Sequence, residues 1–123
     1  MARARIDDLA GRDAVATWRA AQDGGASADR QTLALAVRYT LQVLAEVAPG
    51  GTVEVRVPPF GAVQCIEGPR HTRGTPPNVV ETDAATWLAL ATGSLGWEDG
   101  RAAGRIHASG QRANLDGLLP IIR

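Results

Sequence analysis

The sequence contains no lysine, a single cysteine and no long apolar run. All 13 basic residues are arginine, so chemistry through a lysine Schiff base is excluded. Because Cys65 is the only cysteine, the chain can form neither an intramolecular disulfide nor a cysteine-based metal cluster. No stretch reaches the roughly 18 apolar residues of a membrane-spanning helix, and no apolar run of a secretory signal follows Met1. We therefore expect a cytoplasmic protein with no integral membrane association.

An excess of charge of one sign is also absent. The 13 basic residues balance 13 acidic ones, and neither end of the sequence carries a charged tail. We therefore expect no nucleic acid partner, since such partners are usually held by a basic surface. The two histidines, His71 and His107, lack the spacing of a metal-binding motif, so we expect no metal and no cofactor. The composition gives no indication of the oligomeric state.

The pattern of apolar residues divides the chain into helices and strands within one globular domain, which suits its 123 residues. Helices are expected at residues 12–21, 30–48, 84–92 and 97–103, and between Gly110 and Pro120. Strands are expected at residues 52–57, 60–66, 79–82 and 105–108. The first helix belongs to an N-terminal helical arm, residues 1–26, which ends in a glycine pair.

The helix at residues 30–48 has the clearest periodicity. Asp29 is suited to cap its first turn. One face carries an apolar stripe, which consists of Leu33, Val37, Leu44 and Val47. Leu35 and Tyr39 point away from this stripe, where the N-terminal arm could cover them or leave them partly exposed. Trp18 in the arm favours docking, because a bare indole in water is unfavourable.

The order of the elements predicts an α+β fold with two layers. The connections between the first three strands are too short for parallel crossovers, except for the loop at residues 67–78, so antiparallel pairing is expected. The prediction is a mainly antiparallel sheet of four to five strands with helices covering one face.

The second half of the chain resembles the sterol carrier protein-2 superfamily. Residues 79–83 form an expected strand that leads into a helix at residues 86–93, which ends in a glycine. A second short helix, the pattern of a hydrophobic strand between two glycines at residues 104–110, and a leucine-rich closing helix follow. The resemblance covers residues 52–119 and extends over the helix at 30–48. It implies that residues 27–123 form a sterol-carrier-like domain.

Two segments, residues 53–65 and 68–81, resemble more closely a group of short actinobacterial proteins called sterol carrier family proteins. The same domain type is similar to the C-terminal domain of mycothiol-dependent maleylpyruvate isomerase-like proteins. The metal-binding helical bundle of those enzymes has no counterpart in this sequence. The resemblance therefore implies no catalytic metal role.

The resemblance implies a ligand site between the sheet and the helices, where this superfamily often holds a lipid, a sterol or an acyl chain. The apolar side chains that could line such a site are Val37, Leu41, Leu44, Trp87, Leu90, Leu95, Trp97, Ile106, Leu115, Leu118 and Leu119. The alternative is that these side chains fill a closed core, as is normal in protein interiors. Two rigid tryptophan rings near one pair of helices favour a pocket.

The loop at residues 67–78 has the densest charge in the sequence. Arg70, His71 and Arg73 could hold the carboxylate or phosphate head group of an amphipathic ligand. Alternatively, the loop is solvated, or its arginines pair with nearby carboxylates, which are Glu67, Glu81 and Asp83. Both interpretations of the loop stay open at this point.

A catalytic role receives little support from the residue types. Cys65 and His71 could in principle act as nucleophile and base, but Cys65 lies in an expected strand, where a buried thiol is inert. His107 next to Arg105 has the setting of a surface residue. We therefore expect no catalytic residues.

Three hypotheses about function follow. The favoured one is non-enzymatic binding of an apolar or amphipathic small molecule. The second is a protein-interaction module that uses the 67–78 loop. The third is an accessory enzyme domain that acts on a small anionic substrate at that loop.

Overall fold

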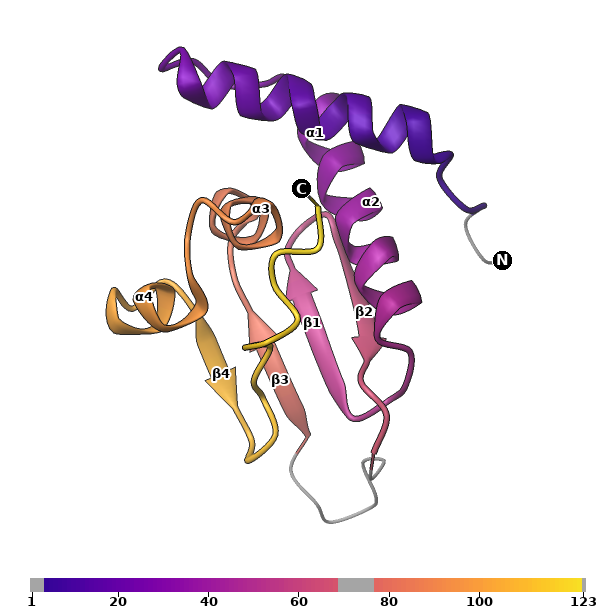
Figure 1. Cartoon of the computed structure of the whole chain (residues 1–123), viewed down its shortest axis with the longest axis vertical. Helices are drawn as coiled ribbons and strands as arrows, with labels where there is room; N and C mark the ends of the chain where they lie inside the picture. The colour runs from indigo at the N-terminus through magenta and orange to yellow at the C-terminus, as the bar shows by residue number, and fades with distance from the viewer. Residues whose placement is uncertain (1–3, 69–76, 123) are drawn as a thin grey trace.

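The computed structural model describes residues 4–68 and 77–122, which form four helices and one sheet (Figure 1). The elements in chain order are α1 (Asp8–Asp23), α2 (Arg30–Val47), β1 (Val53–Val57), β2 (Gly61–Cys65), β3 (Asn78–Glu81), α3 (Ala84–Thr92), α4 (Trp97–Ala102) and β4 (His107–Ser109). These helices and strands confirm the predicted α+β class. In the described part of the chain, no helix is long and apolar enough to cross a membrane.

The sheet is mixed, with the strand order β2-β1-β3-β4. β1 pairs antiparallel with β2, and β3 pairs antiparallel with β4, as expected. The prediction of antiparallel pairing among the first three strands was wrong for β3, which pairs parallel with β1. Cys65 and Asn78 both lie beside Val53 in the register, so the two ends of the β2–β3 connection are only about 10 Å apart. A parallel pair therefore needs no long crossover here, because β2 has already returned the chain to the starting end of β1.

One face of the sheet is buried. Val53, Val55 and Val57 of β1 are fully buried, whereas Arg56 on the opposite face is exposed. This alternation confirms the predicted half-buried strand at residues 52–57.

Helix α2 begins as the sequence predicts, since the side chain of Asp29 accepts a hydrogen bond from the backbone N–H of Thr32. Val37 and Leu44 of the expected stripe are fully buried and Leu33 is partly buried. Val47, however, is 59% exposed, so its assignment to the buried stripe was wrong. Val47 is the last residue of the helix. The next residue, Ala48, caps the helix by donating its N–H to the carbonyl of Leu44.

Helix α1 covers the outer face of α2. It begins earlier than predicted, because the side chain of Asp7 caps it by accepting a hydrogen bond from the N–H of Ala10. Trp18 is buried, and so is Tyr39 of α2, which the arm was expected either to cover or to leave exposed. At Gly11 an added Cβ would collide with the ring of Tyr39, so glycine permits the close approach of the two helices.

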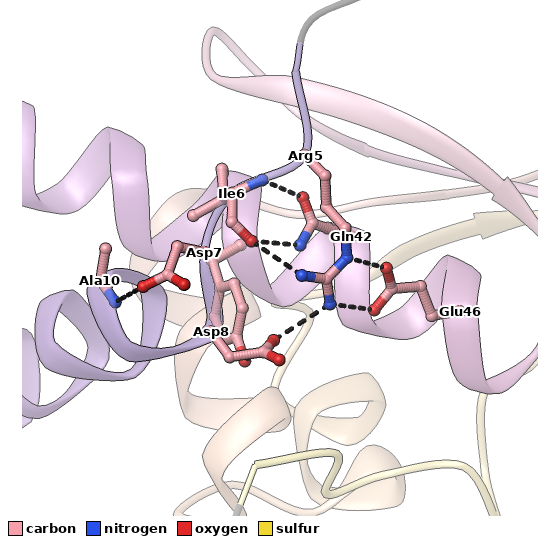
Figure 2. A network of polar contacts seen from close by, with 8 residues as sticks. Arg5, Ile6, Asp7, Asp8, Ala10, Gln42 and Glu46 are labelled. Carbon is pink, nitrogen blue, oxygen red and sulfur yellow. Dashed lines mark hydrogen bonds and ion pairs between the residues drawn. The ribbon is translucent and has the colours of Figure 1, made fainter.

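A polar network fastens the start of α1 to α2 (Figure 2). The guanidinium of Arg5 binds Glu46 at 2.6 Å and Asp8 at 3.0 Å. The side-chain amide of Gln42 bonds to both the N–H and the C=O of Ile6, at 2.8 and 2.9 Å. These contacts join the residues at the N-terminal end of α1 to the C-terminal half of α2.

The same network changes the acidity of two carboxyl groups. A hydrogen bond from the hydroxyl of Tyr39, together with Arg5, lowers the pKa of Asp8. A hydrogen bond from Arg5 lowers the pKa of Glu46. Because both pKa values are lowered in the folded state, the carboxylates stabilise the docked α1 above their unfolded pKa values. That contribution is lost as the pH falls through the lowered values.

The predicted closing helix between Gly110 and Pro120 is absent, and the described residues 110–122 run as turns and extended chain. Gly110 and Gly117 have φ values of +98° and +91°, which a right-handed helix does not permit. The side chain of Asn114 accepts a hydrogen bond from the N–H of Asp116, a local turn that competes with helix formation. The helical spacing of the leucines was therefore misleading, although Leu115 is fully buried.

Candidate functional site

The apolar residues predicted to line a ligand site come together in one layer. They belong to a single cluster with β1, and they come from α2, α3, α4, the C-terminal segment and two connections, with Leu95 between α3 and α4 and Ile106 just before β4. The buried members are Val37, Leu41, Leu44, Trp87, Leu90, Trp97, Ile106 and Leu115, and the partly buried members are Leu95, Leu118 and Leu119. We call this set the apolar layer. The clustering of these side chains is consistent both with a closed core and with a site that opens around a ligand.

The centre of the apolar layer is tightly tied. The indole N–H of Trp87 donates a hydrogen bond of 2.8 Å to the hydroxyl of Thr40, and both residues are fully buried. That hydroxyl donates in turn within α2, with the carbonyls of Ala36 and Val37 at 2.8 and 2.9 Å. The indole N–H of Trp87 and the hydroxyl of Thr40 are therefore both paired, as is normal for buried polar groups.

The second tryptophan of the layer differs. Trp97, the first residue of α4, is only 4% exposed, and its Nε1–H has no hydrogen-bond partner in the described structure. A buried donor without a partner costs about 1–3 kcal/mol. Among the described residues of the apolar layer, this N–H is therefore the only buried side-chain donor that lacks an acceptor.

The C-terminal segment, residues 110–122, closes the layer without forming a helix. It is fixed at one end by a bond from the N–H of Arg112 to the side chain of Asn78. At the other end, the N–H groups of Ile121 and Ile122 both donate to the carbonyl of Ala91 near the end of α3, at 3.0 Å. The segment therefore spans from the start of β3 to the last turn of α3.

A groove lies between the C-terminal segment and α1. It has a volume of about 450 Å³ and is lined by Arg12, Val15, Ala16, Arg19, Ile121 and Ile122. Figure 1 shows the C-terminal end of the chain close beneath α1. The sequence analysis missed this site. The available signal was the spacing of two arginines seven residues apart on one helix face, with Val15 and Ala16 between them.

The predicted head-group residues Arg70, His71 and Arg73 lie outside the described residues, so their role stays a prediction. Of the carboxylates considered as their partners, Asp83 has a defined structural role. Its side chain accepts a hydrogen bond from the N–H of Thr86 and caps α3.

Cys65 lies at the end of β2 and is fully buried. Burial raises the pKa of its thiol to about 11. The thiolate, which is the reactive form, is therefore scarce at neutral pH. This environment opposes the nucleophile hypothesis for Cys65.

We expect Cys65 to react slowly with a thiol reagent in the folded protein. Relative to a free cysteine, with a pKa of about 8.5, the raised pKa alone predicts a rate on the order of a hundredfold lower at pH 8. The measurement is the rate of labelling by Ellman's reagent, with urea-unfolded protein as the control that should label completely. Fast stoichiometric labelling of the folded protein would contradict the assignment of Cys65 to the core.

His107 is exposed on the outer face of the sheet, in the setting expected of it. In the strand register it lies opposite Glu81, which lies opposite Arg56. Arg56 forms an ion pair with Glu54 on the same strand. Among residues 4–68 and 77–122, no three histidine, cysteine or acidic side chains gather in a way that could hold a metal ion.

Comparison with known proteins identifies the family. A family model described as "Bacterial SCP ortholog" matches residues 29–121, a span from the cap of α2 to the C-terminal segment. No curated protein matches the chain. Helix α1 and the arginines of the groove precede the matched span. The chain thus belongs to a sterol carrier protein-like family of bacteria.

Proposed function

We propose that the protein is a non-enzymatic carrier that binds an apolar or amphipathic ligand between the sheet and the helices. Membership of a sterol carrier protein-like family supports a general lipid-binding carrier role. The residues of the apolar layer come from every helix of the matched span, which gives the proposed ligand an almost wholly apolar environment.

The unpaired N–H of Trp97 is the observation that carries the proposal. A closed core normally satisfies its buried donors, and each exception needs an explanation. A ligand oxygen, from a hydroxyl, ester or carboxyl group, would supply the missing acceptor. The ligand is therefore an amphiphile whose chain lies in the layer and whose oxygen reaches Trp97.

The C-terminal segment offers the way in. The side chains of the layer pack closely around Trp87, so a ligand needs part of the covering to move. Helices resist such movement because their backbone bonds form cooperatively. The C-terminal segment has no helical bonds, and its end is held to α3 by two N–H groups that share the carbonyl of Ala91. Its displacement breaks these bonds and the Arg112–Asn78 bond and exposes the buried Leu115, but no helix has to unwind.

The first test is native mass spectrometry of protein purified without detergent, with lipid extraction to identify any bound amphiphile. The second is a titration with 1-dodecanol and with dodecane, followed by tryptophan fluorescence. We expect Trp97→Phe to weaken 1-dodecanol binding by about fivefold, since a hydrogen bond is worth about 1 kcal/mol. Binding of dodecane, which has no oxygen, should stay unchanged in the same variant.

Equal losses for both ligands would assign Trp97 a packing role and remove the polar contact from the proposal. If no amphiphile co-purifies and neither ligand changes the fluorescence, the carrier function is wrong. In that case the protein-interaction hypothesis for the 67–78 loop becomes the leading one.

A further inference from the structure

The groove between α1 and the C-terminal segment combines two cationic side chains with an apolar floor. Arg12 and Arg19 lie two helical turns apart, so their Cα atoms are separated by about 10 Å along the axis. Val15 and Ala16 lie between them on the same face of the helix. A group placed midway along this face is within reach of both long side chains.

Neither guanidinium is neutralised by a carboxylate in the described structure. The ion pairs found there involve Arg5 and Arg56, not Arg12 or Arg19. Asp8 is one turn from Arg12, but its Oδ1 accepts hydrogen bonds from Arg5 and Tyr39. Among the described residues, no carboxylate forms an ion pair with Arg12 or Arg19, although Asp8 is near enough to Arg12 to interact with it electrostatically.

Arg19 lines the groove and also contacts the end of α3. Its Nη2 donates a long hydrogen bond of 3.4 Å to the carbonyl of Thr92, the last residue of α3. A guanidinium has five N–H donors, so this bond leaves most of them available. The wall of the groove opposite α1 is attached to the same turn of α3, because the N–H groups of Ile121 and Ile122 donate to the carbonyl of Ala91.

The floor of the groove is apolar. Val15 is buried, and Ile121 and Ile122 are partly buried against the core. A ligand that only carried a charge would leave this surface in water, whereas an alkyl chain beside the charge would cover it. The volume of about 450 Å³ is within the range of small-molecule sites.

We propose that this groove binds a monomeric anionic amphiphile, with its carboxylate between Arg12 and Arg19 and its alkyl chain against Val15, Ile121 and Ile122. Charge-assisted hydrogen bonds from two arginines select an anion over a neutral head group. The proposed site uses side chains outside the apolar layer, so its argument does not need a ligand in that layer. The two sites share the C-terminal segment, because Ile121 and Ile122 line the groove.

The test compares decanoate with 1-decanol by isothermal titration calorimetry. We expect decanoate to bind at least about tenfold more tightly than 1-decanol, and the double substitution Arg12→Gln and Arg19→Gln to abolish that preference. The matched control is Arg101→Gln with Arg112→Gln, which removes the same charge from exposed sites elsewhere and should keep the preference. Trp97→Phe changes binding in the apolar layer, so only the part of decanoate binding that depends on Arg12 and Arg19 should persist in that variant, which separates this site from the apolar layer.

A second pair of variants tests the geometry. Ala16→Glu places a carboxylate three and four residues from the two arginines, where it can pair with them and replace the ligand's head group. We expect it to remove the preference for decanoate, while the neutral Ala16→Gln leaves that preference in place. Both variants keep a helix-compatible residue, so circular dichroism should show α1 intact.

Three results would overturn the proposal. One is equal affinity of the unmodified protein for decanoate and 1-decanol. Another is an unchanged preference in the Arg12→Gln, Arg19→Gln variant. The third is arginine-dependent binding to phosphatidylglycerol vesicles without any binding of monomeric decanoate, which would assign the groove to a membrane surface instead.

Discussion

Trp87→Ala is expected to lower the free energy of unfolding by about 3–5 kcal/mol, the range for truncation of a buried aromatic side chain. Trp87 of α3 is fully buried, and its indole N–H donates a hydrogen bond to the hydroxyl of Thr40 in α2. The substitution removes apolar contacts, leaves a cavity and takes away that hydrogen bond. Urea unfolding followed by far-ultraviolet circular dichroism measures the change.

A double-mutant cycle separates packing from hydrogen bonding at this position. Thr40→Val removes the acceptor and leaves the Trp87 N–H unpaired, at a cost of about 1–3 kcal/mol. In that background Trp87→Phe should cost less than it does alone, because the orphaned donor is removed. Strict additivity of the two substitutions would show that the hydrogen bond contributes nothing to stability.

Leu44→Ala is expected to destabilise the protein by about 2–5 kcal/mol. Leu44 is fully buried in the middle of the apolar layer, in contact with the same core as Val37 and Leu41. Removing most of its side chain forfeits apolar burial and leaves a space that the surrounding helices and sheet fill only in part.

Val47→Ala is the matched control for Leu44. Both residues belong to the stripe predicted from the sequence, but Val47 is exposed at the end of α2. Its substitution should change the free energy of unfolding by less than about 0.5 kcal/mol, as is usual for surface sites. The same urea experiment measures both, and similar effects of the two substitutions would mean that the burial of α2 differs from that described.

Features specified by residues close in sequence could be predicted. The predicted cap Asp29 accepts a hydrogen bond from the N–H three residues later, and α2 begins beside it. Asp83 caps α3 in the same local way. The alternation of valines with Glu54 and Arg56 identified β1 and its buried face. These signals depend only on local backbone geometry and on which side chains avoid water.

Features that depend on contacts between distant segments could not be predicted in the same way. The side of β1 on which β3 pairs is a choice between two edges, and no periodic pattern records it. The C-terminal segment has helically spaced leucines, yet it is bonded as a non-helical strap to distant segments, with Arg112 bonded to Asn78 and Ile121 to Ala91. The apolar stripe of α2 continued to Val47 in the sequence, whereas the covering layer does not.

The candidate sites differ in the same respect. The apolar layer could be assembled from hydrophobic periodicity and a family resemblance, and its members do lie together. The groove could not, because Arg12 and Ile121 come from opposite ends of the chain and meet only through docking of α1. The residues of the charged loop, Arg70, His71 and Arg73, stay a prediction outside the described structure.

The polar network at the start of α1 has a consequence for the groove, which exists only while α1 is seated. The apparent dissociation constant of a groove ligand equals the intrinsic constant divided by the fraction of molecules with α1 docked. Protonation of Asp8 and Glu46 at acid pH lowers that fraction, since the pKa values of both carboxyl groups are lowered in the docked state. By reciprocity, a ligand in the groove makes α1 harder to detach and both carboxyl groups harder to protonate. Proton binding at one end of α1 and ligand binding along its length are thus thermodynamically linked.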